Sequence, residues 1–167
     1  MKKKLLSIAL SSLVVVSLFI GCSNKKINEN TTVPTNMVSV EHAMGTTEIP
    51  TNPQKVVILT SEGTEALLAL GVKPVGAVTG VTGDWYDHTK DELEGVKQVG
   101  MEREPNIEAI AALKPDLIIG NKMRHEKIYS QLSAIAPTVY SDTIRGAWKD
   151  NFKFYAKVLN KESESEK

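Results

Sequence analysis

Cysteine is almost missing from this sequence, and so is any excess of positive charge. Cys22 is the only cysteine among 167 residues, so no disulfide can form within the chain. Lysine and arginine number 20, as do aspartate and glutamate; three lysines and no acidic residue precede Cys22, which leaves 17 basic against 20 acidic residues and a net charge of −3. A nucleic-acid-binding surface needs clustered lysine and arginine, and this composition argues against one.

Motifs of several enzyme classes are also absent. The sequence has no GxxxxGK(S/T) phosphate loop, and its glycines at 76, 80 and 83 do not fit the GxGxxG dinucleotide fingerprint. Ser61 has a glycine two residues after it but a leucine two residues before it, so it lacks the nucleophile-elbow pattern of hydrolases. We therefore expect a protein that is not an enzyme and has no intrinsic cofactor.

Two chemical alternatives stay open at this point. An extracytoplasmic hydrolase could use Ser61 with His88 or His125 as its base. Asp84, Asp87 and His88 could supply metal ligands, although a polar loop readily produces such a group without binding metal. We expect no metal held directly by the protein.

Residues 1–21 predict an export signal. Three lysines at positions 2–4 precede an apolar stretch from Leu5 to Ile20, and Gly21 then places a small residue before Cys22. This order is typical of a secretory signal, and the apolar stretch is short for a membrane-spanning helix, which needs about 20 residues. Residues 19–22 resemble a bacterial lipobox, which implies lipid on Cys22 and anchoring at the extracytoplasmic face of the cell membrane. The alternative is an ordinary signal peptide with an incidental cysteine.

The chain beyond Cys22 predicts a tether followed by one domain. Residues 22–36 are rich in asparagine, lysine and threonine and are expected to be a flexible linker. From residue 37 onward, short apolar runs that suit buried strands alternate with segments of helical periodicity. Strands that alternate with helices predict an α/β fold with a mostly parallel sheet and helices on both faces. We expect a hairpin over 38–49, strands over 55–60, 74–79, 97–100, 116–120 and 137–140, and helices capped by Ser61 and Asn106, over 125–135 and from 147.

Cationic and aromatic residues follow the predicted strands. Ligands of open parallel sheets bind beyond the carboxyl ends of the strands. Arginine binds carboxylates through two parallel hydrogen bonds, and an aromatic neighbour can pack against the body of a ligand. The sequence therefore predicts a site for an anionic small ligand, with Arg103, Lys122, Arg124, Trp85 and Tyr86 as its candidate residues.

The segment from Met101 to Gly120 is similar to a known family. With EPNIEAIAALKPDLIIG at its centre, it closely resembles iron–siderophore substrate-binding lipoproteins of ABC importers, of the ferric citrate and citrate-siderophore type. They belong to the periplasmic-binding-protein superfamily shared with haem and cobalamin binders. Residues 42–50, 69–76 and 154–159 are also similar to this family, so the resemblance covers essentially the whole chain beyond the tether.

The resemblance implies a receptor that captures a ferric siderophore or ferric citrate and delivers it to an ABC permease in the cytoplasmic membrane. Iron would arrive already chelated. Arg124 and Arg103 would hold carboxylates of the chelate, Trp85 and Tyr86 would pack against it, and Glu108 would dock onto the permease. For Glu108 the alternative is an acid that the dipole of a helix N-terminus favours. Haem, cobalamin or a neutral hydroxamate chelate are the alternative ligands.

Family members consist of two lobes joined by a long helix. The resemblance implies that residues 37–146 are the N-terminal lobe, that 147–167 begin the connecting helix, and that the C-terminal lobe is absent. A truncated gene product, a fragment and one piece of a split receptor are all consistent with this expectation. A truncated product without transport function is the last alternative.

Overall fold

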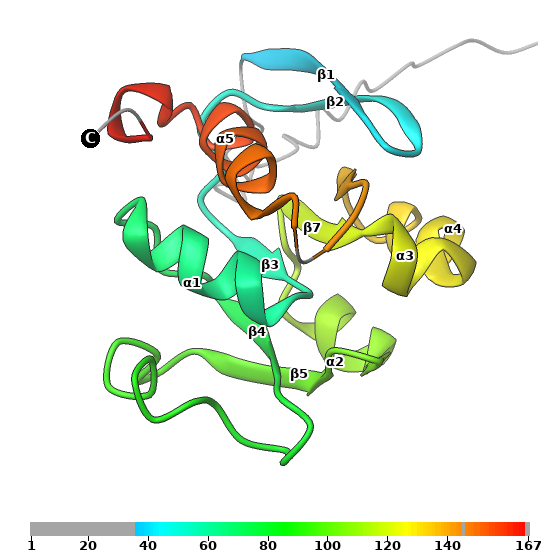
Figure 1. The fold of residues 1–167 in the computed structure, drawn as a ribbon. Coiled ribbons are helices and arrows are strands. Elements are labelled where there is room, and N and C mark those ends of the chain that lie inside the picture. Colours follow the sequence, from blue (N-terminus) through cyan, green and yellow to red (C-terminus); the bar gives the residue numbers. More distant parts are fainter. Residues whose placement is uncertain (1–35, 145, 166–167) are drawn as a thin grey trace, which may run out of the picture. The chain divides into compact units, whose positions relative to one another are not determined.

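The computed structural model describes residues 36–144 and 146–165. Its centre is a six-stranded sheet with the order β6-β5-β4-β3-β7-β8 (Figure 1). Neighbouring strands are parallel except β5 and β6, which are antiparallel. The strands are β3 (Val56–Ile58), β4 (Gly76–Thr79), β5 (Lys97–Met101), β6 (Glu104–Pro105), β7 (Leu117–Asn121) and β8 (Thr138–Ser141).

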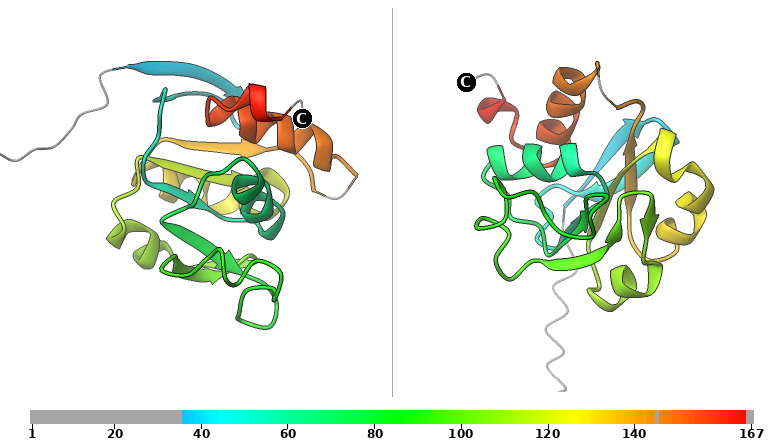
Figure 2. Two further views of the ribbon diagram at one scale, coloured as in Figure 1. Left: turned by 90° about the vertical axis from the view of Figure 1, so that its left-hand side faces the viewer. Right: turned by 60° about the horizontal axis from the view of Figure 1, so that its bottom comes forward.

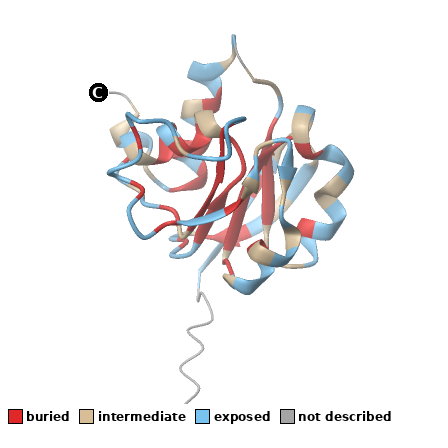
Figure 3. Ribbon diagram, turned by 90° about the horizontal axis from the view of Figure 1, so that it is seen from below, coloured by how far each residue is buried: buried red, intermediate tan, exposed pale blue. Residues whose placement is uncertain are grey.

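Alternate residues of the central strands enter two separate cores, one on each face of the sheet. On β3, Val56 and Ile58 belong to one core and Val57 to the other. Every residue of β3, β4, β7 and β8 is buried, as Figure 3 shows for the strands at the centre of the molecule. Burial on both faces explains why these strands are continuous apolar runs rather than alternating ones.

Helices cover both faces of the sheet (Figure 2). Buried residues of α1 (Ser61–Ala69) and α5 (Trp148–Val158) join the first core, whereas Ile110 of α2 (Ile107–Ala112) and Leu132 of α4 (Tyr129–Ser133) join the second. α3 (Lys122–His125) and the 3-10 turn η1 (Glu126–Ile128) lead into α4, and the 3-10 turn η2 (Glu162–Glu164) follows α5. This is the α/β lobe that the sequence predicts.

A hairpin of β1 (Met37–His42) and β2 (Gly45–Pro50) lies beside β8. The Ala43 amide donates to the Tyr140 carbonyl at 3.0 Å, and the Tyr140 amide donates to Nδ1 of His42 at 3.2 Å. Nε2 of His42 lies 2.8 Å from Oγ1 of Thr47, whose hydroxyl donates to the Thr138 carbonyl at 3.2 Å. The hairpin therefore binds the outer backbone edge of β8. Burial lowers the pKa of His42.

Two local predictions need correction, and one strand was not predicted. Thr60, not Ser61, caps α1: its Oγ1 accepts the Gly63 amide, and Ser61 is the first helical residue. The helix expected over 125–135 begins earlier, at Lys122, and is divided into α3, η1 and α4. The short antiparallel strand β6 was not expected at all. The other predicted strands and helices are present with ends shifted by a few residues.

The final helix, α5, ends at Val158. Asn160, two residues later, has a left-handed φ of 55°. Among the residues that the structure describes, no helix combines the length and the apolar character that crossing a bilayer requires.

Candidate functional site

The carboxyl ends of β3 and β7 lie side by side at the point where the strand order changes direction. From β3 the chain continues to β4 and β5 on one side of the sheet, whereas β7 and β8 occupy the other side. The segments that leave β3 and β7 therefore diverge, and open α/β sheets bind ligands in the crevice formed there. α1 follows β3 at this position, and α3 with Arg124 follows β7.

A bulge in β5 sets up the next part of the site. Ala77 pairs with Gln98 but Thr79 pairs with Met101, so β5 contains one extra residue at this point. Gly100 in the bulge has a φ of 92°, a conformation that residues with a side chain rarely adopt. Met101 pairs with Glu104 of β6, and the turn between them consists of Glu102 and Arg103. The bulge and the turn bring these two charged residues to the edge where β3 and β7 end.

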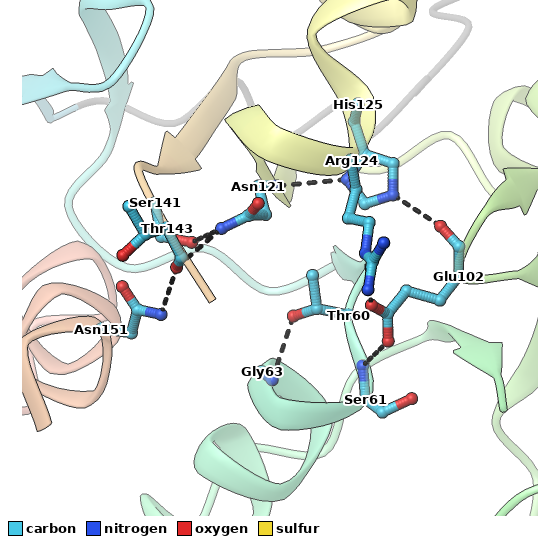
Figure 4. A network of polar contacts seen from close by, with 10 residues as sticks. All are labelled: Thr60, Ser61, Gly63, Glu102, Asn121, Arg124, His125, Ser141, Thr143 and Asn151. Atoms are coloured by element: carbon cyan, nitrogen blue, oxygen red, sulfur yellow. Dashed lines mark hydrogen bonds and ion pairs between the residues drawn. The ribbon is translucent and has the colours of Figure 1, made fainter. Parts of the chain in front are cut away.

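Glu102 connects this turn to α1 and α3 (Figure 4). Its Oε2 accepts the backbone amide of Ser61, the first residue of α1, at 3.1 Å. Its Oε1 accepts Nε of Arg124 at 3.3 Å, and these two side chains are only 22% and 25% exposed. A carboxylate at a helix N-terminus is stabilised by the helix dipole, and its pairing with arginine makes the second bond charge-assisted.

His125 fixes the backbone on either side of this ion pair. Its Nδ1 accepts the Asn121 amide at 3.2 Å, which requires Nε2 to carry the proton that it donates to the Glu102 carbonyl at 2.8 Å. Burial lowers the pKa of His125, because a charged imidazole would lose its contact with water. A neutral, buried histidine with both nitrogens engaged is a structural residue that joins β7 to the turn after β5.

Arg103, Arg124 and Tyr86 line one hollow of about 260 Å³ at this edge of the sheet. Arg103 is exposed. Tyr86 is 45% exposed, and its ring lies against Gly80 at the start of the loop after β4. Its two arginines and one glutamate leave the lining with one net positive charge. The lining residues are Ser61, Gly80, Val81, Tyr86, Met101, Glu102, Arg103 and Arg124.

The other two predicted ligand contacts lie outside this hollow. The half-buried Trp85 packs against the first core and lines a small cavity of about 10 Å³ between α1 and the loop after β4. Its Nε1 has no hydrogen-bond partner among the described residues. Lys122 lines a second hollow of about 480 Å³. Arg124 also lines this second hollow, together with residues 123, 126, 127, 142 and 143. Arg124 is therefore the residue common to the two hollows.

A buried polar network behind the site was not predicted from the sequence. Asn121, at the end of β7, donates through Nδ2 to Oγ of Ser141 and to the Thr143 carbonyl, both at 2.9 Å. Asn151 of α5 donates to the same carbonyl at 2.8 Å (Figure 4). It also donates to Oε1 of Glu62 at 3.0 Å. The single available signal was an asparagine directly after four apolar or glycine positions of a buried strand. The network joins α1, β7, β8 and α5 through these hydrogen bonds.

The alternative of a serine hydrolase receives no geometric support. Within residues 36–144 and 146–165, no hydrogen bond joins Ser61 to a histidine. His88 pairs with Glu65 at 2.9 Å and stacks on Tyr86, and both ring nitrogens of His125 are occupied. In the same part of the chain, no group of three or more histidine, cysteine, aspartate or glutamate residues could hold a metal ion.

Two further predicted residues lie away from the hollow or outside the described chain. Glu108 is exposed in the first turn of α2, with Asn106 as the N-cap whose side chain accepts the Ala109 amide. Cys22, the predicted signal and residues 22–35 of the predicted tether lie outside the described residues.

Residues 56–167 match the family model described as periplasmic binding protein. The chain is 55% identical over 162 residues to the probable siderophore-binding lipoprotein YfiY of Bacillus subtilis, covering 95% of this chain and 50% of that protein. It is 34% identical to the Fe(3+)-citrate-binding protein YfmC of the same organism, covering 96% and 51% of the two chains. The chain thus spans about half the length of the curated relatives it matches.

A solved structure with a bound ligand is also similar. The crystal structure of Staphylococcus aureus SirA complexed with staphyloferrin B superimposes with a TM-score of 0.73 at 48% sequence identity. The superposition covers 77% of this chain and 44% of SirA. The α/β lobe described above therefore corresponds to part of a siderophore-binding protein.

Proposed function

This chain belongs to the periplasmic binding protein family, a family of binding proteins rather than enzymes, and from that premise we propose that it binds a ferric siderophore or ferric citrate for an ABC importer. The hollow at the ends of β3, β5 and β7 is the binding surface. Its anionic ligand brings iron as part of the chelate, so the protein supplies charge and shape rather than metal ligands.

One observation carries this proposal: two arginines from different loops line the same hollow. Arg124 uses only Nε for its bond to Glu102, so both of its terminal amino groups stay free of hydrogen bonds within the described residues. A guanidinium offers five donors in a planar fork that matches a carboxylate. Arg103, exposed on the turn, offers a second fork to the same ligand.

The aromatic and lysine residues extend this surface. Tyr86 presents a ring to the same hollow, suited to the apolar part of a chelate. Lys122 would contact an arm of the ligand that reaches past Arg124 into the second hollow. Trp85 would act through Tyr86, since the two residues line one small cavity next to the ligand.

The remaining assignments concern the partners. Relatives such as YfiY are lipoproteins, which supports lipid on Cys22 and an extracytoplasmic position at the cell membrane for this chain. Glu108, exposed on α2, would dock onto the permease. Haem, cobalamin and neutral hydroxamate chelates are the competing ligands, and the net positive charge of the hollow favours a chelate rich in carboxylates.

Tryptophan fluorescence tests the proposal because one of the two tryptophans lies next to the site. In a Trp148→Phe background, Trp85 is the only tryptophan and adjoins Tyr86. We expect saturable quenching by ferric citrate or by a carboxylate siderophore, with haem, cobalamin and a hydroxamate chelate as the comparison panel. Inner-filter controls are required because these ligands absorb light.

Arg124→Ala should weaken binding by about 10- to 150-fold, since a charge-assisted hydrogen bond contributes roughly 1.5–3 kcal/mol. Lys97→Ala is the matched control, because it removes one exposed positive charge at the opposite, amino end of β5. Equal weakening by both variants would mean that only overall charge matters. Absence of saturable quenching by every chelate would contradict the proposed function of this chain.

A further inference from the structure

We propose that Glu102 is a positioning residue, which holds the Arg124 guanidinium in a ligand-ready orientation before the ligand arrives. The proposal rests on the proposed function of the hollow as an anion site. Glu102 itself lines the hollow, where a negative charge would at first be expected to oppose an anionic ligand. Its contacts explain why a carboxylate is nevertheless present.

Both the backbone and the side chain of Glu102 are fixed by three separate elements. Its amide donates to the Thr79 carbonyl at the end of β4 at 3.1 Å, and its carbonyl accepts Nε2 of His125 at 2.8 Å. Its Oε2 accepts the Ser61 amide at the start of α1. Three of its four polar groups therefore bind rigid parts of the fold, and Oε1 is left for Arg124.

The contact between Glu102 and Arg124 does not occupy the donors of Arg124 that a ligand carboxylate would use. Glu102 accepts from Nε, at the side of the guanidinium, through one oxygen at 3.3 Å. A carboxylate that competed with the ligand would occupy two donors of the fork in parallel. Here the terminal amino groups make no hydrogen bond within the described residues, so the fork stays available to a ligand carboxylate.

Arginine has several rotatable bonds, and fixing such a side chain on binding costs conformational entropy. Glu102 fixes Arg124 while the protein folds, so this cost does not fall on the binding step. In Glu102→Gln the amide oxygen can accept either from Ser61 or from Arg124, and the amide NH₂ then faces the other donor. One of the two contacts must be lost.

Glu104→Gln is the matched control. Glu104 lies in the same short hairpin and its loss changes the net charge equally, but its exposed side chain makes no hydrogen bond or ion pair among the described residues. Any difference between the two variants therefore reports on the contacts that the Glu102 carboxylate makes with Ser61 and Arg124, and not on net charge.

The first measurement needs no ligand. In the ¹⁵N-labelled 167-residue chain, the Nε–H signal of Arg124, assigned with Arg124→Lys, should have a high order parameter. This order parameter should fall in Glu102→Gln and stay unchanged in Glu104→Gln. An Arg124 that is equally ordered in both variants would overturn the proposal, whether or not any chelate binds.

The second measurement is ferric citrate binding by the same three proteins. Relative to Glu104→Gln, Glu102→Gln should weaken binding by about three- to tenfold, the range expected for immobilising one long side chain. Tighter binding by Glu102→Gln than by Glu104→Gln would show that Glu102 competes for Arg124 and would refute the positioning role. Lack of binding by the unsubstituted chain would instead contradict the proposed function, while the order parameter would still decide the role of Glu102.

Discussion

Replacing Gly100 by alanine would place a Cβ atom 2.6 Å from the carbonyl oxygen of Glu104 and 2.8 Å from the amide nitrogen of Asn106. Both neighbours are backbone atoms, so neither can move away by changing a rotamer. The φ of 92° adds a second penalty, since a residue with a side chain rarely adopts it. The substitution therefore strains the bulge that carries the Glu102–Arg103 turn.

The two penalties can be estimated separately. Backbone strain of this kind costs about 1–3 kcal/mol, and overpacking costs about 1–3 kcal/mol more. We expect Gly100→Ala to lower the free energy of unfolding by about 2–6 kcal/mol, measured by urea denaturation. Because the turn shifts with the bulge, ligand binding should weaken under conditions in which the variant is still folded.

Gly95→Ala separates the two penalties. Gly95 has a φ of 83°, but a Cβ atom there would meet no atom within 4 Å. This variant should show the backbone cost alone, so the difference between the two variants isolates the steric term. If Gly100→Ala is no more destabilising than Gly95→Ala, the close approach of the β6 backbone to Gly100 is not a real constraint.

Two further predictions concern groups behind the hollow. The folded protein holds His125 neutral because burial lowers its pKa, whereas an unfolded histidine takes up a proton near pH 6.5. The stability that His125 confers at neutral pH should therefore be lost as the pH falls from about 6.5 toward the lowered pKa. The loss should be at most about 1.4 kcal/mol per pH unit. Urea midpoints between pH 7 and 5.5 should show a smaller dependence on pH in His125→Gln than in His88→Gln, which alters an exposed histidine; equal slopes would contradict this assignment. Asn151→Ala removes two hydrogen bonds of a buried side chain and leaves the half-buried Glu62 without its amide partner, so it should destabilise the protein by about 1–3 kcal/mol in the same assay. A loss below about 0.5 kcal/mol, the range of ordinary surface substitutions, would mean that water replaces Asn151 without cost.

The order of strands and helices could be predicted because both cores are made of short apolar runs separated by recognisable ends. Asn106 caps α2 as its sequence context indicates, and the segment after residue 116 forms a buried strand. The α1 cap was misplaced by one residue because Thr60 and Ser61 are both good capping residues. Only the structure shows that the Thr60 hydroxyl reaches the Gly63 amide.

The site could be predicted only in part. Arg103, Arg124 and Tyr86 each follow a predicted strand, and the sequence therefore places them at one edge of the sheet. In the structure these three residues line one hollow. Trp85 was expected there too, but an indole ring is large and apolar enough to pack against the core instead. The role of Glu102 could not be derived from the sequence, because it depends on the bulge in β5. The order of residues alone does not show where a strand is bulged.

Both outer edges of the sheet are closed to strand addition. On the β8 side, the β1–β2 hairpin uses the backbone groups of Tyr140 and Thr138 that another strand would need. On the other side, β6 is two residues long, and β5 beyond it carries a bulge and the exposed Lys97. Short edges, bulges and edge lysines are the devices by which natural sheets avoid pairing with another chain. The strand ends, where the proposed ligand surface lies, can therefore stay open while the sides of the six-stranded sheet offer no template for pairing with another chain.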